Sequence, residues 1–321
     1  MSKEKSSVEN IFIEFNFNKN LSSRKKALDI SYQIAIKRYL EWVTILKNDE
    51  IESLLDKINT NLFITGYSIE NEKFTKTKYS ALITVNLDLL KIKNYFKNNN
   101  ISFFLEEGPK TLIIPVIKYK NRSILWDDPN PWFEAWMKRP LDANLTDFLL
   151  PTGQVDDLIT LSAKHAEDFV NYKIKNMSTK YNAEEVLILQ LEIQQTQGFY
   201  NLQLLVYQGL KEEKLLLEDF AYKKEKNLEK SILNLANAFA KKYDDLWVED
   251  NIKRLELESY ALVRLNYNSF SDWMKIKRFL LNSQNLSSLE IRSMSNSSAI
   301  VFIKFLSKEK LVYDLEANNI Y

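Results

Sequence analysis

The chain of 321 residues has no cysteine, one histidine, 5 glycines and 6 prolines. The missing cysteines exclude disulfides, thiolate nucleophiles and cysteine-bound zinc or iron–sulfur clusters. The single histidine excludes a zinc site with two imidazole ligands, and a serine–histidine–aspartate relay would have to use His165. No two glycines are neighbours, so no glycine-rich phosphate loop is present and enzymes of ATP or dinucleotides are not expected.

Long hydrophobic runs and an excess of one charge are also missing. Lysine and arginine number 44 against 43 acidic residues, a net charge of +1, so a nucleic-acid partner is not expected. No stretch reaches the roughly 18 to 20 apolar residues of a membrane span. Residues 1–7 are polar and lead directly into a strand-like pattern, so no signal peptide is predicted in this numbering. The protein is then cytoplasmic, or a signal has been removed.

The composition that remains is that of a globular protein, with 45% hydrophobic, 12% aromatic and 27% charged residues. We predict a mixed α/β and α+β fold, in which two small split-βαβ-like α+β domains flank a central α/β domain. The change in hydrophobic period near Gly108 and Asn251 sets the boundaries. They give an N-terminal domain over residues 1–107, a central domain over 108–250 and a C-terminal domain over 251–321.

The N-terminal pattern alternates strands and helices in a recognisable order. It predicts a strand near residue 11, a helix to residue 46, a hairpin that turns at residues 70–73, a helix over 88–97 and a last strand over 101–105. This order is that of the split βαβ arrangement. The C-terminal pattern repeats the element order, with its first strand beginning near Leu255, although no residue-level repeat is visible.

The central domain contains a Pro/Trp-rich segment, residues 109–151, with all 6 prolines and three of the 6 tryptophans. A buried strand is predicted over 112–117, with Pro115 indicating an edge or a bulge. Helical residues 156–182, strands that include 215–220, and a helix over 227–247 complete the prediction.

Trp126, Trp132 and Trp136 suggest two alternatives. They form an aromatic platform for a sugar, a peptide or a partner protein, or they fill the core beneath the sheet. The core interpretation is favoured for Trp132 and Trp136, and partial exposure for Trp126.

Carboxylates around the tryptophans supply a second candidate chemistry. Together with Asp142 and Asp147, they are numerous enough for a metal site or a glycosidase-like acid/base pair. Their spacing matches no calcium loop, and Asp156 and Asp157 equally suit a helix start, so no metal, cofactor or catalytic residue is predicted. His165 is expected at the surface or at a helix cap. The predicted ligand- or partner-binding residues are Trp126, Asp127, Asp128, Asn130, Trp132, Trp136, Asp156 and Asp157.

The Leu-Trp-x-x-x-Asn-Pro-Trp pattern of residues 125–132, with Trp136 behind it, resembles an uncharacterised bacterial family called domain of unknown function 2066. The resemblance extends through Pro151-Thr152-Gly153 and residues 180–189, and to the first helix and the strand over 79–87. It implies export to the periplasm and no established activity. The middle segment is also similar in element order to the TolB amino-terminal domain and to the middle domain of a flagellar T-ring protein.

These observations favour a non-enzymatic, envelope-associated interaction or assembly protein with an unidentified protein partner. One alternative is a carboxylate-dependent hydrolase or glycan-binding protein that uses the Trp/Asp-rich loop. Another is a cytosolic binding module, which fits the absence of an apolar leader in residues 1–7.

Overall fold

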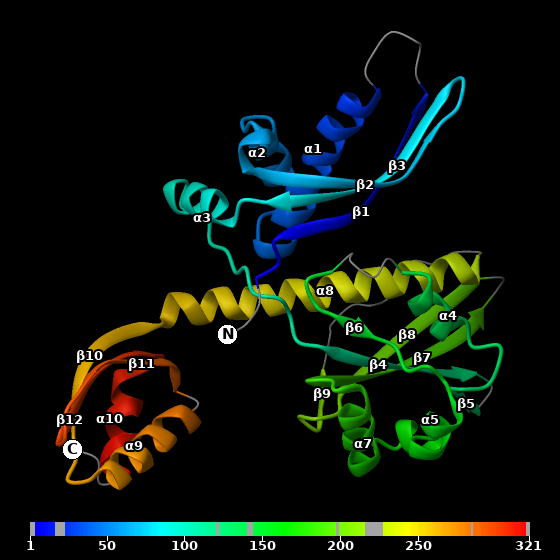
Figure 1. Ribbon diagram of the computed structural model, residues 1–321. Helices are drawn as coiled ribbons and strands as arrows, with labels where there is room; N and C mark the ends of the chain where they lie inside the picture. The colour runs from blue at the N-terminus through cyan, green and yellow to red at the C-terminus, as the bar shows by residue number, and fades with distance from the viewer. Residues whose placement is uncertain are drawn as a thin grey trace. The chain divides into compact units, whose positions relative to one another are not determined.

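A computed structural model of the chain describes residues 4–16, 23–119, 122–139, 144–196, 199–215, 227–283 and 285–318. Helices and strands are mixed, in agreement with the predicted α/β and α+β class, and the strands form three separate sheets (Figure 1). The chain divides into two compact units, residues 1–248 and 249–321. The first unit contains two of the sheets. The predicted boundary at residue 107 lies between these two sheets, and it stays a prediction.

The first sheet has three antiparallel strands in the order β1-β3-β2, so the last strand in sequence lies in the middle. Alternate side chains of β3 are buried, including Tyr79, Ile83 and Val85, because one face of the sheet packs against α1. The elements are β1 (Ser7–Asn16), α1 (Ser23–Val43), α2 (Asn48–Leu55), the short 3-10 helix η1 (Thr60–Phe63), β2 (Ile64–Phe74), β3 (Lys78–Leu87) and α3 (Leu89–Asn98).

Two details of this sheet differ from the sequence prediction. The chain turns at residues 75–77, whereas at residues 70–73 the register shifts around Asn71, which has a φ of 51°. Asparagine tolerates this left-handed conformation, so the polar residues form a bulge inside β2. Residues 101–105 are all described but add no strand to the sheet. The N–H of Phe104 donates to Val43 O at 2.8 Å, so this apolar run packs at the end of α1 and the split-βαβ pattern lacks its last strand.

The central sheet has the order β5-β4-β7-β8-β9, with the short β6 also beside β4. β4 is parallel to β6 and β7, and the other pairs are antiparallel. Pro115 lies in β4 where the side away from β7 has no strand partner, as a proline requires, and its carbonyl accepts from Asn130 Nδ2 at 3.2 Å. The strands are β4 (Thr111–Tyr119), β5 (Arg122–Ile124), β6 (Phe148–Leu149), β7 (Glu185–Thr196), β8 (Phe199–Gln208) and β9 (Glu213–Leu215).

Helices cover both faces of the central sheet, which gives three layers (Figure 1). One face carries α4 (Pro131–Met137) and α8 (Leu228–Leu257), and the other carries α5 (Val155–Thr160), α6 (Ala163–Glu167) and α7 (Asn171–Tyr181). Of the strand predicted over 215–220, only Leu215 lies within the described residues.

The prediction that α8 ends at residue 247 and that a strand begins near Leu255 is wrong. Val248 and Ile252 are buried four residues apart, which continues the helical spacing of the apolar face. The helix therefore extends to Leu257, and β10 begins at Ser259.

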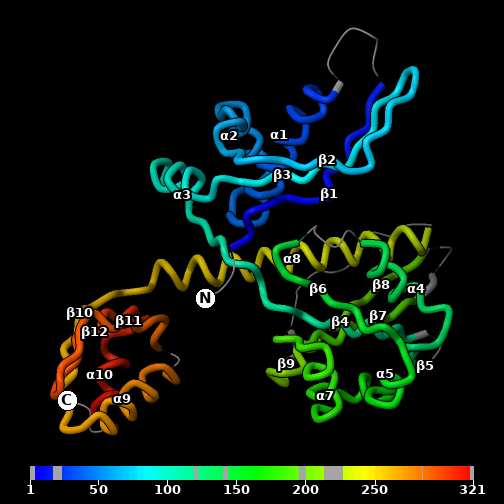
Figure 2. The backbone as a smooth tube through the Cα atoms, viewed as in Figure 1, coloured from blue at the N-terminus to red at the C-terminus, as the bar shows by residue number. Residues whose placement is uncertain are grey.

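The C-terminal unit repeats the topology of the first sheet, with antiparallel order β10-β12-β11. Figure 2 shows that its two helices lie on one face of the sheet. Trp273, Ile276 and Leu280 of α9 recur at helical spacing and are buried there against Val301 and Ile303. The elements are β10 (Ser259–Asn266), α9 (Phe270–Asn282), β11 (Leu286–Met294), β12 (Ser298–Phe305) and α10 (Lys308–Ala317).

Candidate functional site

The tryptophans of α4 belong to the core of the central domain. Trp132 is completely buried and Trp136 is 3% exposed, and their rings meet edge to face at 5.8 Å. The indole N–H of Trp132 donates to Leu189 O on β7 at 3.0 Å, which satisfies its one polar atom. These two residues are therefore structural, as the favoured interpretation expected, and they do not form a platform for a ligand.

Asn130 holds the segment that leads into α4. Its side-chain oxygen accepts from the N–H groups of Trp132 at 3.1 Å and Phe133 at 3.0 Å, which caps the helix. Its amide group donates to Leu125 O at 2.9 Å and to Pro115 O. Asn130 is 6% exposed, and all of these partners belong to the protein itself, so it is not free to bind a ligand.

Asp157, another of the predicted binding residues, is also buried and bonded to other residues of the protein. Its carboxylate is fully buried and accepts from Gly153 N at 2.9 Å, Tyr181 OH at 2.7 Å and Lys180 Nζ at 2.6 Å. Burial opposes ionisation, but hydrogen bonds from Lys180 and Tyr181 outweigh it and hold the pKa of Asp157 below its ordinary value. Gly153 has a φ of 70°, which favours glycine in this turn. The cluster joins the turn before α5 to the end of α7.

A second buried carboxylate, Asp244 of α8, was not predicted as a site residue. It accepts from Asn144 Nδ2 and Leu145 N, both at 2.8 Å, and from Thr146 N at 3.0 Å. Arg139 donates to Asn144, and its guanidinium lies 4.8 Å from the Trp136 ring. Burial raises the pKa of Asp244 and lowers that of Arg139 to about 10. Because about 100 residues separate Asp244 from its partners, spacing in the sequence gives no signal for this network.

The remaining predicted residues lie at the surface around α5. Trp126 is half-buried beside Gly153, and its indole N–H donates to Leu161 O at 2.6 Å. Three apolar side chains of α5 are exposed, Val155 by 70%, Leu158 by 44% and Ile159 by 70%. The exposed carboxylates of Asp127, Asp128 and Asp156 form no ion pair with a described residue. We call this surface the α5 patch; it comprises Trp126, Asp127, Asp128, Val155, Asp156, Leu158 and Ile159.

The predicted carboxylates do not form one site. Among the described residues no group of three or more histidine, aspartate or glutamate side chains is placed to hold a metal ion. Asp147 is exposed, and Asp142 lies outside the described residues. His165 stands in the first turn of α6, where its backbone N–H donates to Ser162 Oγ at 3.2 Å and its Nδ1 accepts from Ser162 N at 3.4 Å, the two bonds of a capping box. It is therefore a cap residue, one of the two placements that the sequence analysis expected.

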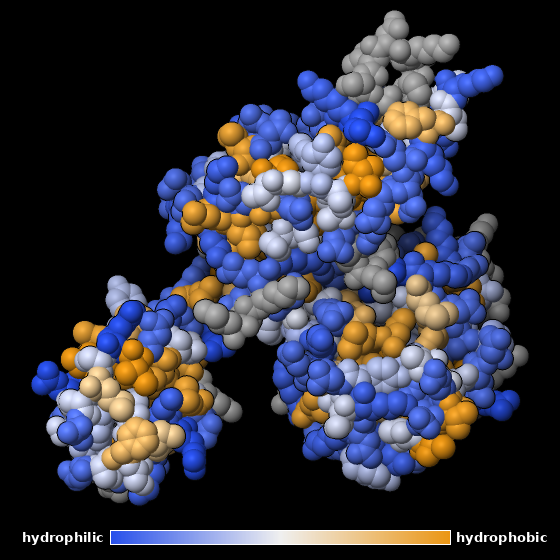
Figure 3. Space-filling model, viewed as in Figure 1, coloured by the Kyte–Doolittle hydropathy of each residue, from blue (hydrophilic) through white to orange (hydrophobic). Residues whose placement is uncertain are grey.

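A second exposed apolar surface lies on the C-terminal unit, on the face of its sheet opposite α9 and α10. Tyr260 is 75% exposed and Leu262 is 65% exposed, and the Tyr260 and Phe302 rings are 6.0 Å apart. Figure 3 shows apolar patches among hydrophilic residues on the visible surface of this unit. Arg264 and Lys304 are exposed on the same face and form no ion pair with a described residue. The C-terminal sheet face comprises Tyr260, Leu262, Arg264, Ile300, Phe302 and Lys304, together with Glu290 of β11, which lies beside Phe302 and pairs with Arg292.

The N-terminal sheet provides a matched comparison because the strand order is the same. Its central outward row places Phe12 beside Leu82, as the C-terminal sheet places Leu262 beside Phe302. The flanking rows differ. Glu14 pairs with Ser80 in the first sheet, whereas Arg264 pairs with Ile300 in the second. On the other side of the central strand, Ser68 of β2 pairs with Thr84 of β3, and at the matching place Ser288 of β11 pairs with Lys304 of β12. Both central rows place a glutamate on the other side of the apolar pair, Glu70 beside Leu82 and Glu290 beside Phe302, so the two faces differ mainly in Tyr260, Arg264, Ile300 and Lys304.

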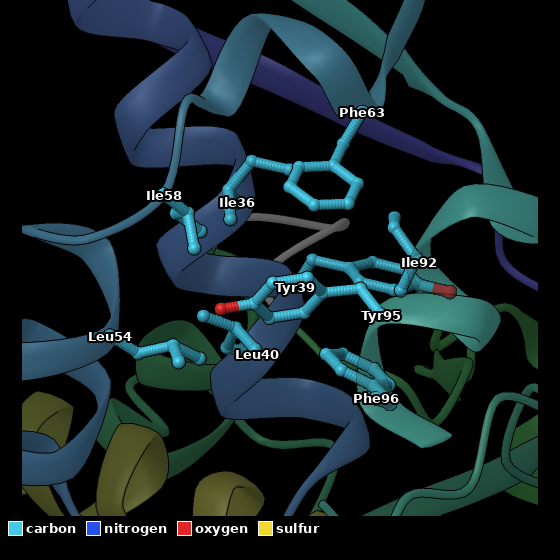
Figure 4. A pocket seen from close by; sticks show the side chains of 9 residues that line it. All are labelled: Ile36, Tyr39, Leu40, Leu54, Ile58, Phe63, Ile92, Tyr95 and Phe96. Atoms are coloured by element: carbon cyan, nitrogen blue, oxygen red, sulfur yellow. The ribbon is translucent and has the colours of Figure 1, made fainter. Parts of the chain in front are cut away.

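An apolar pocket between the helices of the N-terminal domain is too small for a ligand. Side chains from α1, α2, η1 and α3 converge on it, among them Tyr39, Phe63 and Phe96 (Figure 4). Its free space is about 10 Å³, the lower limit for one water molecule. The side chains themselves fill this region, so it is part of the N-terminal core.

Comparisons with protein-family models, curated proteins and solved structures find no match to this chain. The resemblance of residues 125–132 to domain of unknown function 2066 therefore stays a prediction. In the part of the chain that the structure describes, no helix combines the length and apolar character that a membrane crossing requires.

Proposed function

We propose that this chain is a non-enzymatic binding protein that holds a protein partner on the C-terminal sheet face. The observation that carries this proposal is the exposure of Tyr260 and Leu262 on a sheet whose opposite face is already packed. Exposed apolar surface of this kind, bordered by polar groups, is typical of interaction sites. Aromatic and arginine side chains are also enriched in protein interfaces.

The geometry of the C-terminal sheet face supports a binding role more than catalysis. One ring and one charged group lie next to the Phe302 ring. The Tyr260 ring is 6.0 Å from it, and the Arg292 guanidinium is 5.4 Å from its centre. The face is wide and open and contains no paired nucleophile and base. The hydrolase alternative depended on the Trp/Asp-rich loop, where Trp132 and Asp157 are now assigned to the structure of the fold.

Site-specific photo-cross-linking in cells tests this proposal. A photoreactive residue replaces Leu262, and a control carries the same residue at Phe12, the matching position of the N-terminal sheet, which is 60% exposed. We expect a discrete cross-linked species from position 262 and none, or a much weaker one, from position 12. No adduct at position 262, or equal adducts at both positions, would contradict the proposal.

The cellular compartment is a separate part of the proposal. Envelope association follows from the family resemblance of residues 125–132 and from no structural observation. Fractionation of cells that express the full open reading frame tests it, and recovery of the protein in the cytosol would remove this part while leaving the binding face as proposed.

A further inference from the structure

We infer that β10 is the edge through which two copies of this chain form a dimer, by antiparallel pairing with β10 of the second copy. The two three-stranded C-terminal sheets then become one continuous sheet. This inference goes beyond the proposed function, because it concerns the backbone edge of the C-terminal sheet, whereas the proposed protein partner lies on the outward face. It rests on the differences between β10 and the other edge strands of the two matched sheets.

β10 has a neighbouring strand on one side only. It stands at the end of the order β10-β12-β11 and pairs with β12 along residues 259–266. Its backbone has no hydrogen bond to any other described residue. An edge strand presents a row of N–H and C=O groups that can pair with a strand of another chain. Among the described residues nothing covers the outer side of β10, so it is open to such pairing.

β10 also lacks the irregularities that protect the other edge strands. β1, β2 and β11 each contain a register shift, and in β1 the shift includes Asn10, which has a φ of 51°. The pairing of β10 with β12 has no shift, and residues 259–266 contain no proline. Bulges and prolines in edge strands hinder pairing with a second chain. β10 is therefore better suited than β1, β2 or β11 to accept a further strand.

The matching edge of the N-terminal sheet is partly covered by the same chain. Glu4 forms an isolated antiparallel bridge with Glu106, and the N–H of Lys5 donates to Leu105 O at 3.4 Å. Residues 105 and 106 therefore lie beside the beginning of β1. No described residue lies beside β10 in this way, so the two sheets differ at this edge although their strand order is the same.

The inward side chains of β10 show the same difference. Ala261 and Val263 face the C-terminal core but are only partly buried. Ile11 and Ile13 occupy the matching positions of β1, and they are 0% and 4% exposed. A strand added beside β10 covers Ala261 and Val263, and removal of their apolar surface from water favours the pairing.

The outward side chains of β10 suit pairing of the strand with itself. When Leu262 lies on a two-fold axis, Tyr260 of each copy lies opposite Arg264 of the other, so the dimer contains this aromatic–cation pair twice. A pair of the same kind already exists on this sheet, where the Arg292 guanidinium is 5.4 Å from the centre of the Phe302 ring. The strand is therefore complementary to a second copy of itself.

Charge and symmetry also favour a second copy as the occupant. Arg264 is the only charged residue of β10, and Glu258 immediately precedes the strand. In this register Glu258 lies diagonally across from Arg264 of the other copy, a separation that long side chains can span. On the inward face Ala261 lies opposite Val263. A two-fold contact of this kind uses the same surface on both copies and closes as a dimer.

Analytical ultracentrifugation of the full chain over a concentration series tests the dimer. Leu262→Lys places two lysines opposite each other on the axis and leaves the fold intact, because Leu262 is 65% exposed. Phe12→Lys is the matched control, since Phe12 holds the same position in β1 and is 60% exposed. We expect the wild type and the control to dimerise equally well, and Leu262→Lys to dimerise at least about tenfold more weakly. Circular dichroism checks that both variants fold.

Cysteine cross-linking tests the register, because the chain has no cysteine of its own. Under mild oxidation Leu262→Cys should form a disulfide-linked dimer, since the two side chains face each other across the axis. Tyr260→Cys alone should not, because its two copies lie about 13 Å apart along the strands. A mixture of Tyr260→Cys with Arg264→Cys should form the disulfide again, whereas the control Phe12→Cys should form none.

Three results would overturn the inference: the wild type stays monomeric at every concentration, Leu262→Lys dimerises as the wild type does, or Leu262→Cys forms no more disulfide than Phe12→Cys. The mass of the photo-cross-linked species from cells separates these results from failure of the proposed function. A species of twice the chain mass supports the dimer, and one of any other mass reports a different protein on the face. A monomeric chain with an adduct of another mass therefore refutes the dimer alone, and a monomeric chain with no adduct refutes both.

Discussion

Trp132 of α4 and Tyr260 of β10 are both large aromatic residues next to a sheet, but Trp132 is completely buried whereas Tyr260 is 75% exposed. Trp132 lies between the central sheet and α8, so its ring has protein on every side. Tyr260 points away from α9 and α10, and the described residues place no layer over it. The aromatic residue of α4 is therefore part of the core, whereas that of β10 is part of the surface.

The comparison shows which pattern in the sequence indicates a binding surface. A strand with one packed face alternates apolar and polar residues. In β10 and β12 the inward row includes Val263 and Val301, yet the outward row also contains Leu262 and Phe302. The N-terminal sheet has one such outward pair, Phe12 beside Leu82, so what distinguishes the C-terminal strands is that Tyr260 and Ile300 extend the apolar residues along the outward face. The two tryptophans of α4, Trp132 and Trp136, instead belong to the core of the central domain.

The largest effect is expected for Trp132→Ala. The substitution leaves a cavity between β7 and α8 and an unpaired Leu189 carbonyl, so it should lower the free energy of unfolding by about 3 to 5 kcal/mol. Thermal or urea unfolding of the purified protein measures the loss.

Trp126→Ala is the matched control within the same segment. Because Trp126 is half-buried, its loss should cost clearly less than that of Trp132. If both variants lose equally little free energy of unfolding, the Pro/Trp-rich segment does not stabilise the fold. The contrast drawn between a buried Trp132 and an exposed Tyr260 would then be wrong.

The second effect is expected for Asp157→Asn, which removes a buried carboxylate whose ion-pair partner, Lys180, is 33% exposed. A cost of about 1 to 3 kcal/mol at neutral pH is expected, because the hydrogen bonds that Lys180 and Tyr181 donate to a charged acceptor are lost or weakened. The pKa of Asp157 is lower in the folded protein than its ordinary value of about 3.9. Its contribution is therefore present above that pH and is lost as the pH falls through the folded-state pKa.

Unfolding curves from pH 7 down to the acid limit check this sign. The difference in stability between the wild type and Asp157→Asn should shrink as the pH falls below about 4. Asp244, whose pKa burial raises, responds to pH in the opposite direction, but it is present in both proteins and cancels in the difference. A difference that stays constant down to the lowest pH would show that Asp157 is not ionised in the folded protein.

Much of the fold was predictable from local patterns. The helix predicted over 88–97 is present as α3, with Asp88 as its cap, and Trp273, Ile276 and Leu280 recur at helical spacing on the buried face of α9. Local patterns failed where a long-range contact decided the outcome. The apolar residues 101–105 pack at the end of α1 and form no strand, and the register of β2 on β3 makes a bulge at Asn71.

The candidate site was only partly predictable for the same reason. The sequence pattern does not distinguish one aspartate of this region from another. The fold, however, buries Asp157 among hydrogen-bond donors and leaves Asp127 and Asp128 exposed to solvent. That separation depends on Lys180 and Tyr181, more than 20 residues away. The C-terminal sheet face needs the pairing of β10 with β12 before its outward rows can be read as one surface.

The smallest effect is expected for an outward leucine of β10. Comparing it with an inward leucine of the same strand tests the contrast between surface and core most closely. Leu262 points outward and is 65% exposed, whereas Leu265 points into the C-terminal core and is 5% exposed. Leu265→Ala should lower the free energy of unfolding by about 2 to 5 kcal/mol, since it removes buried methyl groups and leaves a cavity. Leu262→Ala should change it by less than about 0.5 kcal/mol in dilute protein, because little buried surface is lost. Both substitutions have the same chemistry and similar strand propensity costs, so the difference between them reports burial alone. Equal losses would mean that the outward row is covered within a single chain, and the surface proposed for a partner would already be occupied.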